Sequence, residues 1–364
     1  MKMRAAVVYE KNKPMRIEEV TLDDPKADEV MVKMVATGLC HTDWHACRGA
    51  SSPPLPTVLG HEGAGIVEKV GSSVTALKPG DHVITFAFWS CGKCAMCASG
   101  QPNYCMNRRT APGELPSGGK RLHNSAGQDI NHYFTQSSFA EYLVCYERQA
   151  IKIREDAPLD VACVLACGAT TGIGQSLNMA GVRAGQSVAI YGCGGVGLSA
   201  LLGAKLAGAH PIIAVDVLAD KLRLAKDLGA NYTINASTED PVKRIQEITG
   251  VGVDHALECI GNVKALEQAF LSQRPLGKCV VVGVFPPDAK IPFAPSLFLG
   301  GRTLSGGVEG NIVPSIDLPK FVNLYMEGKL PLDKLVTRRI TLDQIDAGFD
   351  AMERGEVIRS VIKF

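Results

Sequence analysis

The sequence has no hydrophobic segment that is suited to spanning a membrane. Its longest stretch without a charged residue, Val161–Val182, contains Thr170, Gln175 and Asn178 together with several glycines, and these polar groups disfavour the bilayer interior. The N-terminal apolar run, Ala5–Tyr9, is too short for a secretory signal. We therefore expect a cytoplasmic protein without a membrane partner.

The sequence also has little excess charge of either sign. Its 38 basic and 37 acidic residues nearly cancel, and no basic tail or stripe indicates a nucleic-acid partner. The 364 residues, of which 46% are hydrophobic, suffice for two domains with cores of their own. The composition is therefore that of an ordinary globular protein.

The first 150 residues predict short strands separated by Pro-Gly and Gly-Ser turns. The expected strands are Ala5–Tyr9, Glu29–Thr37, Gly63–Val70 and His82–Phe86. They indicate an antiparallel, partly barrel-like β region. A polar segment, 107–137, is over-long for a plain connection, and we expect a loop there with a functional or interfacial role.

The pattern changes after Cys167 to strands that alternate with helices. Strands are predicted at Ser187–Tyr191, Pro211–Val215, Val253–Glu258 and Lys278–Val284, and helices at Gly197–Leu206 and Leu218–Leu228. This alternation predicts βαβ units and a parallel sheet, so the fold class is α/β. Two or three helices and a terminal strand, Val361–Phe364, are expected after Gly310.

Twelve cysteines are present, and four of them crowd into one short segment: Cys91, Cys94, Cys97 and Cys105. Four thiolates at this spacing indicate a tetrahedral zinc site, which requires a reducing compartment. The main alternative is the bacterial iron–sulfur pattern, in which three residues separate the last two cysteines and a proline follows. Here seven residues separate Cys97 from Cys105. Because four thiolates fill the coordination sphere, the site is structural. Six further cysteines fit small buried hydrophobic residues: Cys47, Cys145, Cys163, Cys193, Cys259 and Cys279.

A second candidate metal set consists of Cys40, His61 and Cys167, each in a short glycine-bearing segment. Spacing alone does not separate these three from packed core residues. Two thiolates and one imidazole would leave a fourth tetrahedral position for water or substrate, which is a catalytic zinc arrangement.

A dinucleotide fingerprint, Gly192-x-Gly194-x-x-Gly197, follows one expected strand and opens a helix. The glycines allow a tight turn, close approach to a pyrophosphate, and close packing of helix on strand. Asp216 ends the next strand, where a carboxylate accepts hydrogen bonds from ribose hydroxyls and repels a 2′-phosphate, so NAD is favoured over NADP. Lys221 can add a donor near the same ribose. A purely structural turn is the alternative.

These motifs resemble those of the zinc-dependent medium-chain alcohol dehydrogenases, and the resemblance runs essentially end to end. It implies a GroES-like, mostly-β catalytic domain over 1–168 and 309–364, and a Rossmann NAD-binding domain with a doubly wound parallel sheet over 169–308. The length of the 107–137 segment resembles the longer, usually dimeric members, which include benzyl alcohol and formaldehyde dehydrogenases. The matching motifs are GLCHTDWH at 38–45, GHEGAG at 60–65, the four-cysteine segment, ACGATTG at 166–172, GCGGVG at 192–197 and IRSVIKF at 358–364.

The resemblance implies two zinc ions per subunit, a catalytic one at Cys40, His61 and Cys167 and a structural one at the four clustered cysteines. Asp43 would orient His61, and Glu62 would stand behind the catalytic metal, either as a nearby charge or as a transient ligand that replaces water. Thr42 would take the proton of the zinc-bound alcohol and pass it through the nicotinamide ribose to His45, since an imidazole titrates near neutral pH. The alternatives are a surface salt bridge for each carboxylate and a surface role for His45.

The resemblance also implies the residues that contact NAD. His41 and Arg359 would contact the pyrophosphate, and a histidine in place of the family's frequent arginine would hold NADH less tightly at high pH. Thr171, Val196, Ile260, Val282 and Val284 would line the nicotinamide side of the site. For the aliphatic residues among them, a role in core packing agrees with the sequence equally well. The full implied set is His41, Thr171, Gly192, Gly194, Gly195, Val196, Gly197, Asp216, Lys221, Ile260, Val282, Val284 and Arg359.

The expected reaction is reversible hydride transfer from a primary alcohol to NAD, giving the aldehyde. Small Ala87, where many members carry a bulky residue, favours longer or aromatic alcohols. A thiol-cofactor-linked formaldehyde dehydrogenase, or an enzyme with tightly held NAD, is the alternative; the acid that holds glutathione adducts is missing from RGASSPPLPT at 48–57. A non-catalytic NAD sensor is disfavoured because the ligand set is complete. We expect a homodimer, with a tetramer as the alternative.

Overall fold

The computed structural model describes residues 1–49, 53–291 and 293–364, so part of the RGASSPPLPT loop lies outside the described residues. Contacts between residues divide the chain into two compact units. One unit comprises Met1–Cys167 and Val313–Phe364, and the other comprises Gly168–Ile312. Each unit has its own sheets and core.

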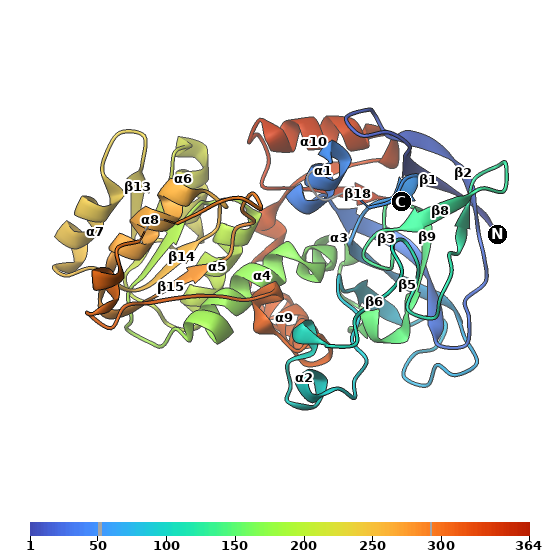
Figure 1. Ribbon diagram of the computed structural model, residues 1–364, viewed down its shortest axis with the longest axis horizontal. Helices are drawn as coiled ribbons and strands as arrows, with labels where there is room; N and C mark the ends of the chain where they lie inside the picture. The colour runs from blue at the N-terminus through green and yellow to red at the C-terminus, as the bar shows by residue number, and fades with distance from the viewer. Residues whose placement is uncertain (50–52, 292) are drawn as a thin grey trace. The chain divides into compact units, whose positions relative to one another are not determined.

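The first unit is mostly β-sheet, as predicted. A closed barrel and a seven-stranded sheet make up its framework (Figure 1). The barrel strands, in spatial order, are β1 (Lys2–Val8), β2 (Arg16–Leu22), β7 (Leu122–His123), β8 (Asp129–His132) and β4 (Thr57–Val58). The sheet runs β10 (Ala150–Lys152), β6 (His82–Thr85), β5 (Glu62–Val70), β3 (Glu29–Gly38), β18 (Arg359–Lys363) and β17 (Val336–Ile340), and β9 (Tyr142–Tyr146) also pairs with β3.

Burial of apolar side chains holds the strands of this unit together. Buried side chains from β1, β2, β7 and β8 meet in one hydrophobic core. The C-terminal strand β18 pairs antiparallel with the end of β3, where Val361 lies opposite Gly38. This pairing brings the last strand to the residues immediately before Cys40.

The 107–137 segment contains two strands, which corrects the expectation of a loop; its functional or interfacial role stays a prediction. It supplies β7 and β8, which close the barrel. Within it, Arg121 is buried and forms an ion pair with buried Glu29 at 2.7 Å. The two strands escaped prediction because β7 has only two residues and depends on pairing with the distant β2.

The first unit has five α-helices among the described residues, together with short 3-10 turns. None of the helices in the described part of either unit is long and apolar enough to cross a membrane. The helices are α1 (His41–Arg48), α2 (Ala95–Ala98), α3 (Leu159–Ala162), α9 (Pro314–Met326) and α10 (Ile345–Glu353). The 3-10 turns are η1 (Pro102–Tyr104), η2 (Glu147–Gln149), η3 (Cys163–Ala166), η7 (Leu332–Leu335) and η8 (Leu342–Gln344).

The second unit is the predicted Rossmann fold. Its sheet is parallel throughout, and the chain enters at a central strand, moves outward to one edge and then returns to the other side. This strand order defines a doubly wound sheet with a switch point between β11 and β14. In spatial order the strands are β13 (Tyr232–Asn235), β12 (Ile212–Asp216), β11 (Val188–Tyr191), β14 (Val253–Glu258), β15 (Gln273–Val281) and β16 (Thr303–Gly306).

Helices flank this sheet: α5 contacts α4 and α6, whereas α7 contacts α8. Strand β15 begins earlier and ends earlier than predicted, so Val282 and Val284 follow the strand instead of belonging to it. The helices are α4 (Gly168–Gly174), α5 (Gly195–Leu206), α6 (Ala219–Leu228), α7 (Pro241–Thr249) and α8 (Val263–Leu271), and the shorter turns are η4 (Gln175–Ala180), η5 (Pro295–Phe298) and η6 (Glu309–Asn311).

Candidate active site and metal centres

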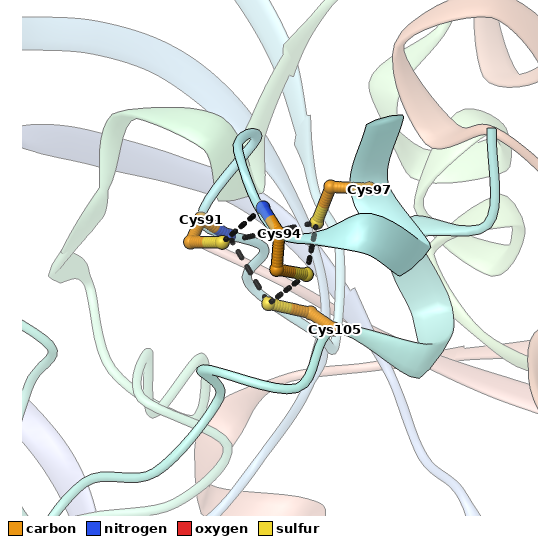
Figure 2. A group of neighbouring side chains, drawn as sticks. All are labelled: Cys91, Cys94, Cys97 and Cys105. Atoms are coloured by element: carbon orange, nitrogen blue, oxygen red, sulfur yellow. Dashed lines mark hydrogen bonds between the residues drawn. The ribbon is translucent and has the colours of Figure 1, made fainter. Parts of the chain in front are cut away.

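The four clustered cysteines converge on one point (Figure 2). All four sulfur atoms lie within 4.8 Å of one another. The Cys94 sulfur is 3.5 Å from that of Cys97 and 3.9 Å from that of Cys105, and the sulfurs of Cys91 and Cys97 are 4.0 Å apart. Tetrahedral zinc with Zn–S bonds of 2.3 Å requires sulfur separations of about 3.8 Å. The donor set therefore fits zinc in both chemistry and size.

Backbone groups prepare this lobe for thiolates. Gly92 adopts a left-handed conformation with φ of 71°, which lets the chain turn between the first two cysteines. N–H groups of Cys97 and Met106 lower the pKa of the Cys94 thiol to about 6. The amide of Asn107 donates to the Cys91 sulfur at 3.4 Å. Such N–H···S contacts favour the ionised ligand.

The second set also comes together. One donor atom from each of Cys40, His61, Glu62 and Cys167 lies within 4.8 Å of the others. Cys40 is the N-cap of α1, His61 directly precedes β5, and Cys167 follows η3. Cys167 lies close enough to lower the pKa of the Cys40 thiol well below its ordinary value. Two thiolates and an imidazole suit zinc, and the Glu62 carboxylate lies beside them.

Asp43 orients the histidine of this set. Its Oδ1 lies 2.9 Å from His61 Nδ1 and accepts the backbone N–H of Gly60 at 3.0 Å. The other ring nitrogen, His61 Nε2, is buried and finds no hydrogen-bond partner among the described residues. An Nδ1–H donated to Asp43 leaves the Nε2 lone pair for a metal.

Burial raises the pKa of the fully buried Asp43 carboxyl, and the neighbouring His61 opposes that rise. Burial alone would lower the pKa of His61, but Asp43 and Cys40 together raise it well above its ordinary value. Gly60 has φ of +91°, and a Cβ there would lie 2.6 Å from the Phe139 ring. Only glycine therefore fits the turn that presents its N–H to Asp43.

Glu62 faces Arg359 in a buried ion pair, with Oε1 3.2 Å from Nη1. The same Nη1 donates to the carbonyl of Leu39 at 3.0 Å. Burial raises the pKa of Glu62 to about 8, against the opposing charge of Arg359. The contact of Arg359 with the cofactor pyrophosphate stays a prediction. Its ion pair with Glu62 was not predicted from the sequence. Gly38 makes room for this pair, because a Cβ at this position would overlap with the Glu62 carboxylate.

Helix α1 carries the remaining residues assigned to proton transfer. The Thr42 hydroxyl lies 3.5 Å from the Cys40 sulfur, so it is beside the metal set. His45 and His41 are exposed on the same helix, with ring centroids 6.3 Å apart. Their exposure lets either imidazole exchange protons with solvent.

Two aromatic residues beside the metal set were missed from sequence. The Phe134 ring centroid is 4.9 Å from that of His61, and the Tyr133 centroid is 6.1 Å away. The Tyr133 hydroxyl donates to the Thr42 carbonyl at 3.3 Å. An adjacent Tyr-Phe pair in an otherwise polar segment was the available signal.

The glycine motif has the geometry of a dinucleotide-binding turn. Gly192 has φ of 93°, and a Cβ on Gly197 would lie 1.7 Å from the Gly192 carbonyl. Gly194 is the N-cap of α5, and no atom lies within 4 Å of where its Cβ would be. The three positions thus provide the tight turn, the close packing and the open approach to the helix N-terminus.

Asp216 is tied to this turn. Its Oδ2 accepts the N–H of Cys193 at 2.6 Å, and its Oδ1 accepts those of Val217 and Leu218 at 2.8 and 3.0 Å. The carboxylate is thus held at the carboxyl end of β12, next to the glycine turn. Lys221 is half-buried in the first turns of α6.

The residues assigned to the nicotinamide side differ in exposure. Ile260 is 54% exposed and Val284 is 72% exposed, so core packing does not explain these two. Val196 and Val282 are half-buried. Thr171 donates from its hydroxyl to Glu309 at 3.0 Å.

Five of the other six cysteines are buried, as predicted, whereas Cys259 is half-buried. All twelve cysteines are free, and none of these six belongs to a metal-binding group of the described chain. Burial raises the pKa of each thiol: Cys47, Cys145, Cys163, Cys193, Cys259 and Cys279.

The chain is similar to known dehydrogenases over its whole length. Family models for the alcohol dehydrogenase GroES-like domain and for zinc-binding dehydrogenase match residues 26–155 and 195–327. It is 41% identical to S-(hydroxymethyl)glutathione dehydrogenase of Paracoccus denitrificans, covering 100% of both chains. It is 42% identical to alcohol dehydrogenase 1 of Pisum sativum, covering 100% of this chain and 97% of that protein.

Solved structures give the same result. Benzyl alcohol dehydrogenase from Acinetobacter calcoaceticus superposes with a TM-score of 0.95 at 40% identity, over 100% of this chain and 99% of that one. An alcohol dehydrogenase zinc-binding domain protein from Burkholderia ambifaria gives 0.97 at 40% identity, with the same coverage.

Proposed function

Since the chain belongs to the zinc-dependent alcohol dehydrogenase family, we propose that it oxidises primary alcohols reversibly to aldehydes with NAD. The observation that carries the proposal is the set of Cys40, His61 and Cys167 beside a buried aspartate that orients the imidazole. A three-ligand set of this kind leaves one coordination position for the substrate oxygen.

We propose that these three residues hold the catalytic zinc and that Cys91, Cys94, Cys97 and Cys105 hold the structural one. When bound, the catalytic zinc lowers the pKa of an alcohol, and NAD accepts the hydride. Asp43 keeps His61 in the ligating tautomer. Glu62, balanced by Arg359, places a negative charge behind the metal set.

The proton path proposed for the reaction starts at Thr42 and ends at His45. The Thr42 hydroxyl lies beside Cys40, where it can accept the proton of a bound alcohol. His45 is three residues further along α1, on the same helix face, and its exposure allows release of the proton to solvent. The ordering of the two groups by exposure supports this direction of transfer.

The coenzyme is assigned to the second unit, for which we propose residues 169–308 as the NAD-binding domain and 1–168 with 309–364 as the catalytic domain. The pyrophosphate would bind at the N-terminus of α5, over Gly194, Gly195 and Val196. Asp216 would accept the ribose hydroxyls and exclude the 2′-phosphate of NADP, with Lys221 as an additional donor.

The substrate class proposed is a longer or aromatic primary alcohol. The small side chain of buried Ala87 would leave more room for the substrate than the bulky residue that many family members carry at this position. The named relative that acts on S-(hydroxymethyl)glutathione supports the alternative of thiol-linked formaldehyde oxidation, but RGASSPPLPT at 48–57 contains no acid to hold such an adduct. Both substrates therefore belong in the same assay.

The test is the formation of NADH by zinc-loaded enzyme with ethanol, hexanol, benzyl alcohol and S-(hydroxymethyl)glutathione, with NADP in parallel. We expect turnover with NAD that favours the larger alcohols, and a loss of at least about 100-fold in Cys40→Ala, because a metal ligand is removed. Turnover confined to the glutathione adduct would establish the alternative. Absence of turnover with every substrate would contradict the proposal.

The proposed assembly is a cytoplasmic homodimer. Strand β16 is an edge of the parallel sheet within the described residues, and nearby apolar side chains are exposed, including Leu276 at 74% and Leu299 at 89%. An exposed edge with apolar neighbours is suited to pairing with a second chain.

A further inference from the structure

The four-cysteine lobe is closed by a contact between the residues that flank it. Phe88 precedes Cys91, and Arg108 follows Cys105. The guanidinium carbon of Arg108 lies 4.1 Å from the centroid of the Phe88 ring, which is a cation–π geometry. The N–H of Arg108 also donates to the Cys105 carbonyl at 3.4 Å. The position of Arg108 therefore depends on the lobe.

Phe88 continues this contact toward the candidate catalytic metal set. Its ring centroid is 5.4 Å from that of Phe134, which is in turn 4.9 Å from that of His61. The Phe134 carbonyl accepts the side-chain amide of Gln149 at 3.0 Å, which anchors the residue at one point, and its ring is held by the neighbouring rings. Arg108, Phe88, Phe134 and His61 thus form a continuous row, which we call the aromatic row.

The ring of Phe88 is not held by close packing on every side. Phe88 is half-buried and lines a cavity of about 530 Å³ together with Ser90, Cys97 and Arg148. On the side of this cavity no neighbouring atoms oppose displacement of the ring, whereas Phe86 and Phe134 lie against it elsewhere, with ring centroids 6.5 and 5.4 Å away. The Arg108 contact restrains the ring against movement into the cavity.

We propose that Arg108 is a positioning residue that holds Phe88 and Phe134 as the apolar wall for the substrate side chain. The inference rests on the proposed function, because it places the alcohol oxygen at the metal set that contains His61. A bulky alcohol extends from that point to the aromatic row, whereas ethanol is too short to reach beyond Phe134. Arg108 therefore acts on the affinity for large alcohols and leaves small ones unaffected.

The chain offers a matched control for this idea. Arg109 is the next residue and is exposed, so Arg109→Ala removes the same charge from the same loop without touching the aromatic row. Arg108→Lys retains a cation that can lie over Phe88, and Arg108→Met retains the aliphatic stem without the charge.

The experiment compares Arg108→Ala with these variants by steady-state kinetics, zinc content and hydrogen–deuterium exchange. We expect KM for benzyl alcohol to rise about two- to sixfold in Arg108→Ala, which corresponds to the loss of one cation–π contact that is partly open to solvent, with kcat and the KM for ethanol nearly unchanged. Exchange should rise in peptides covering 86–89 and 132–136 while two zinc ions remain. Arg109→Ala should match the wild type, and Arg108→Lys should recover most of the effect.

Unchanged exchange at 132–136, or equal effects on ethanol and benzyl alcohol, would overturn the proposal. If Arg108→Ala does not fold, the same comparison is made with Arg108→Met. Exchange and zinc content do not depend on turnover. A wild type without dehydrogenase activity would therefore refute the proposed function, and the exchange data would still decide whether Arg108 orders the aromatic row.

Discussion

At the scale of single residues, His132 makes the stability of the barrel depend on pH. Its side chain is buried, and Nε2 accepts the backbone N–H of Arg121 at 3.0 Å. Burial, with the nearby charge of Arg121, lowers the pKa of His132 from 6.5 to about 3. Between these values the unfolded chain binds a proton that the folded chain does not, so folding stability falls as the pH falls.

The expected loss is about 1.4 kcal/mol per pH unit below the unfolded pKa, or about 2 kcal/mol at pH 5. His132→Gln keeps an acceptor for the Arg121 N–H but does not titrate. Urea unfolding of the wild type and of His132→Gln at pH 7.5 and pH 5 measures the effect. Subtracting the loss of stability in the variant from that in the wild type removes the contribution of the metal sites, which both proteins share. Parallel losses in the two proteins would show that His132 is not the responsible group.

At the scale of elements, the four-cysteine lobe depends on its metal. Between Cys91 and Cys105 it contains only α2 and η1 as regular structure, and α2 buries no side chain. A segment with so little core is ordered by coordination instead of by packing.

Replacing Cys97 by serine should therefore lower the zinc content from two ions per chain to one and expose the lobe to protease cleavage between residues 91 and 105. Cys279→Ala is the matched control, because it removes a buried thiol that belongs to no metal group among the described residues. Zinc analysis and mapping of limited-proteolysis fragments test the prediction. Retention of both zinc ions in Cys97→Ser would contradict it.

Elements with a local signal were predictable from sequence, and those that depend on distant partners were not. The apolar character of Glu29–Gly38 and Val253–Glu258 places these strands to within one residue. The short strand β7 has no such pattern and exists through pairing with β2. The same holds for the site: motifs predict Cys40 and His61 as ligands, whereas the Tyr-Phe pair at 133–134 gives only a weak signal for the contact of Phe134 with His61. No pattern in the sequence indicates the contact of Arg359 with Glu62.

At the scale of the whole molecule, the proposed homodimer interface at the edge strand β16 can be tested by substitution. If the exposed Leu276 and Leu299 cover a partner, changing both to glutamate should convert a dimer of twice 38.7 kDa to the 38.7 kDa monomer. Light scattering after gel filtration measures the mass. Val251→Glu is the control, because Val251 is also exposed, at 63%, but does not adjoin β16. A dimer that survives the double change would place the interface elsewhere.

The ion pair between Arg359 and Glu62 also fixes the order in which the molecule can be completed during synthesis. The guanidinium and the Leu39 carbonyl that it binds are 320 residues apart in the chain. At about 5–20 residues per second, a ribosome needs roughly 15–60 s to make the intervening polypeptide. During that interval Glu62 has already been made without its buried counterion, so the candidate metal centre matures late, after almost all of the chain has been translated.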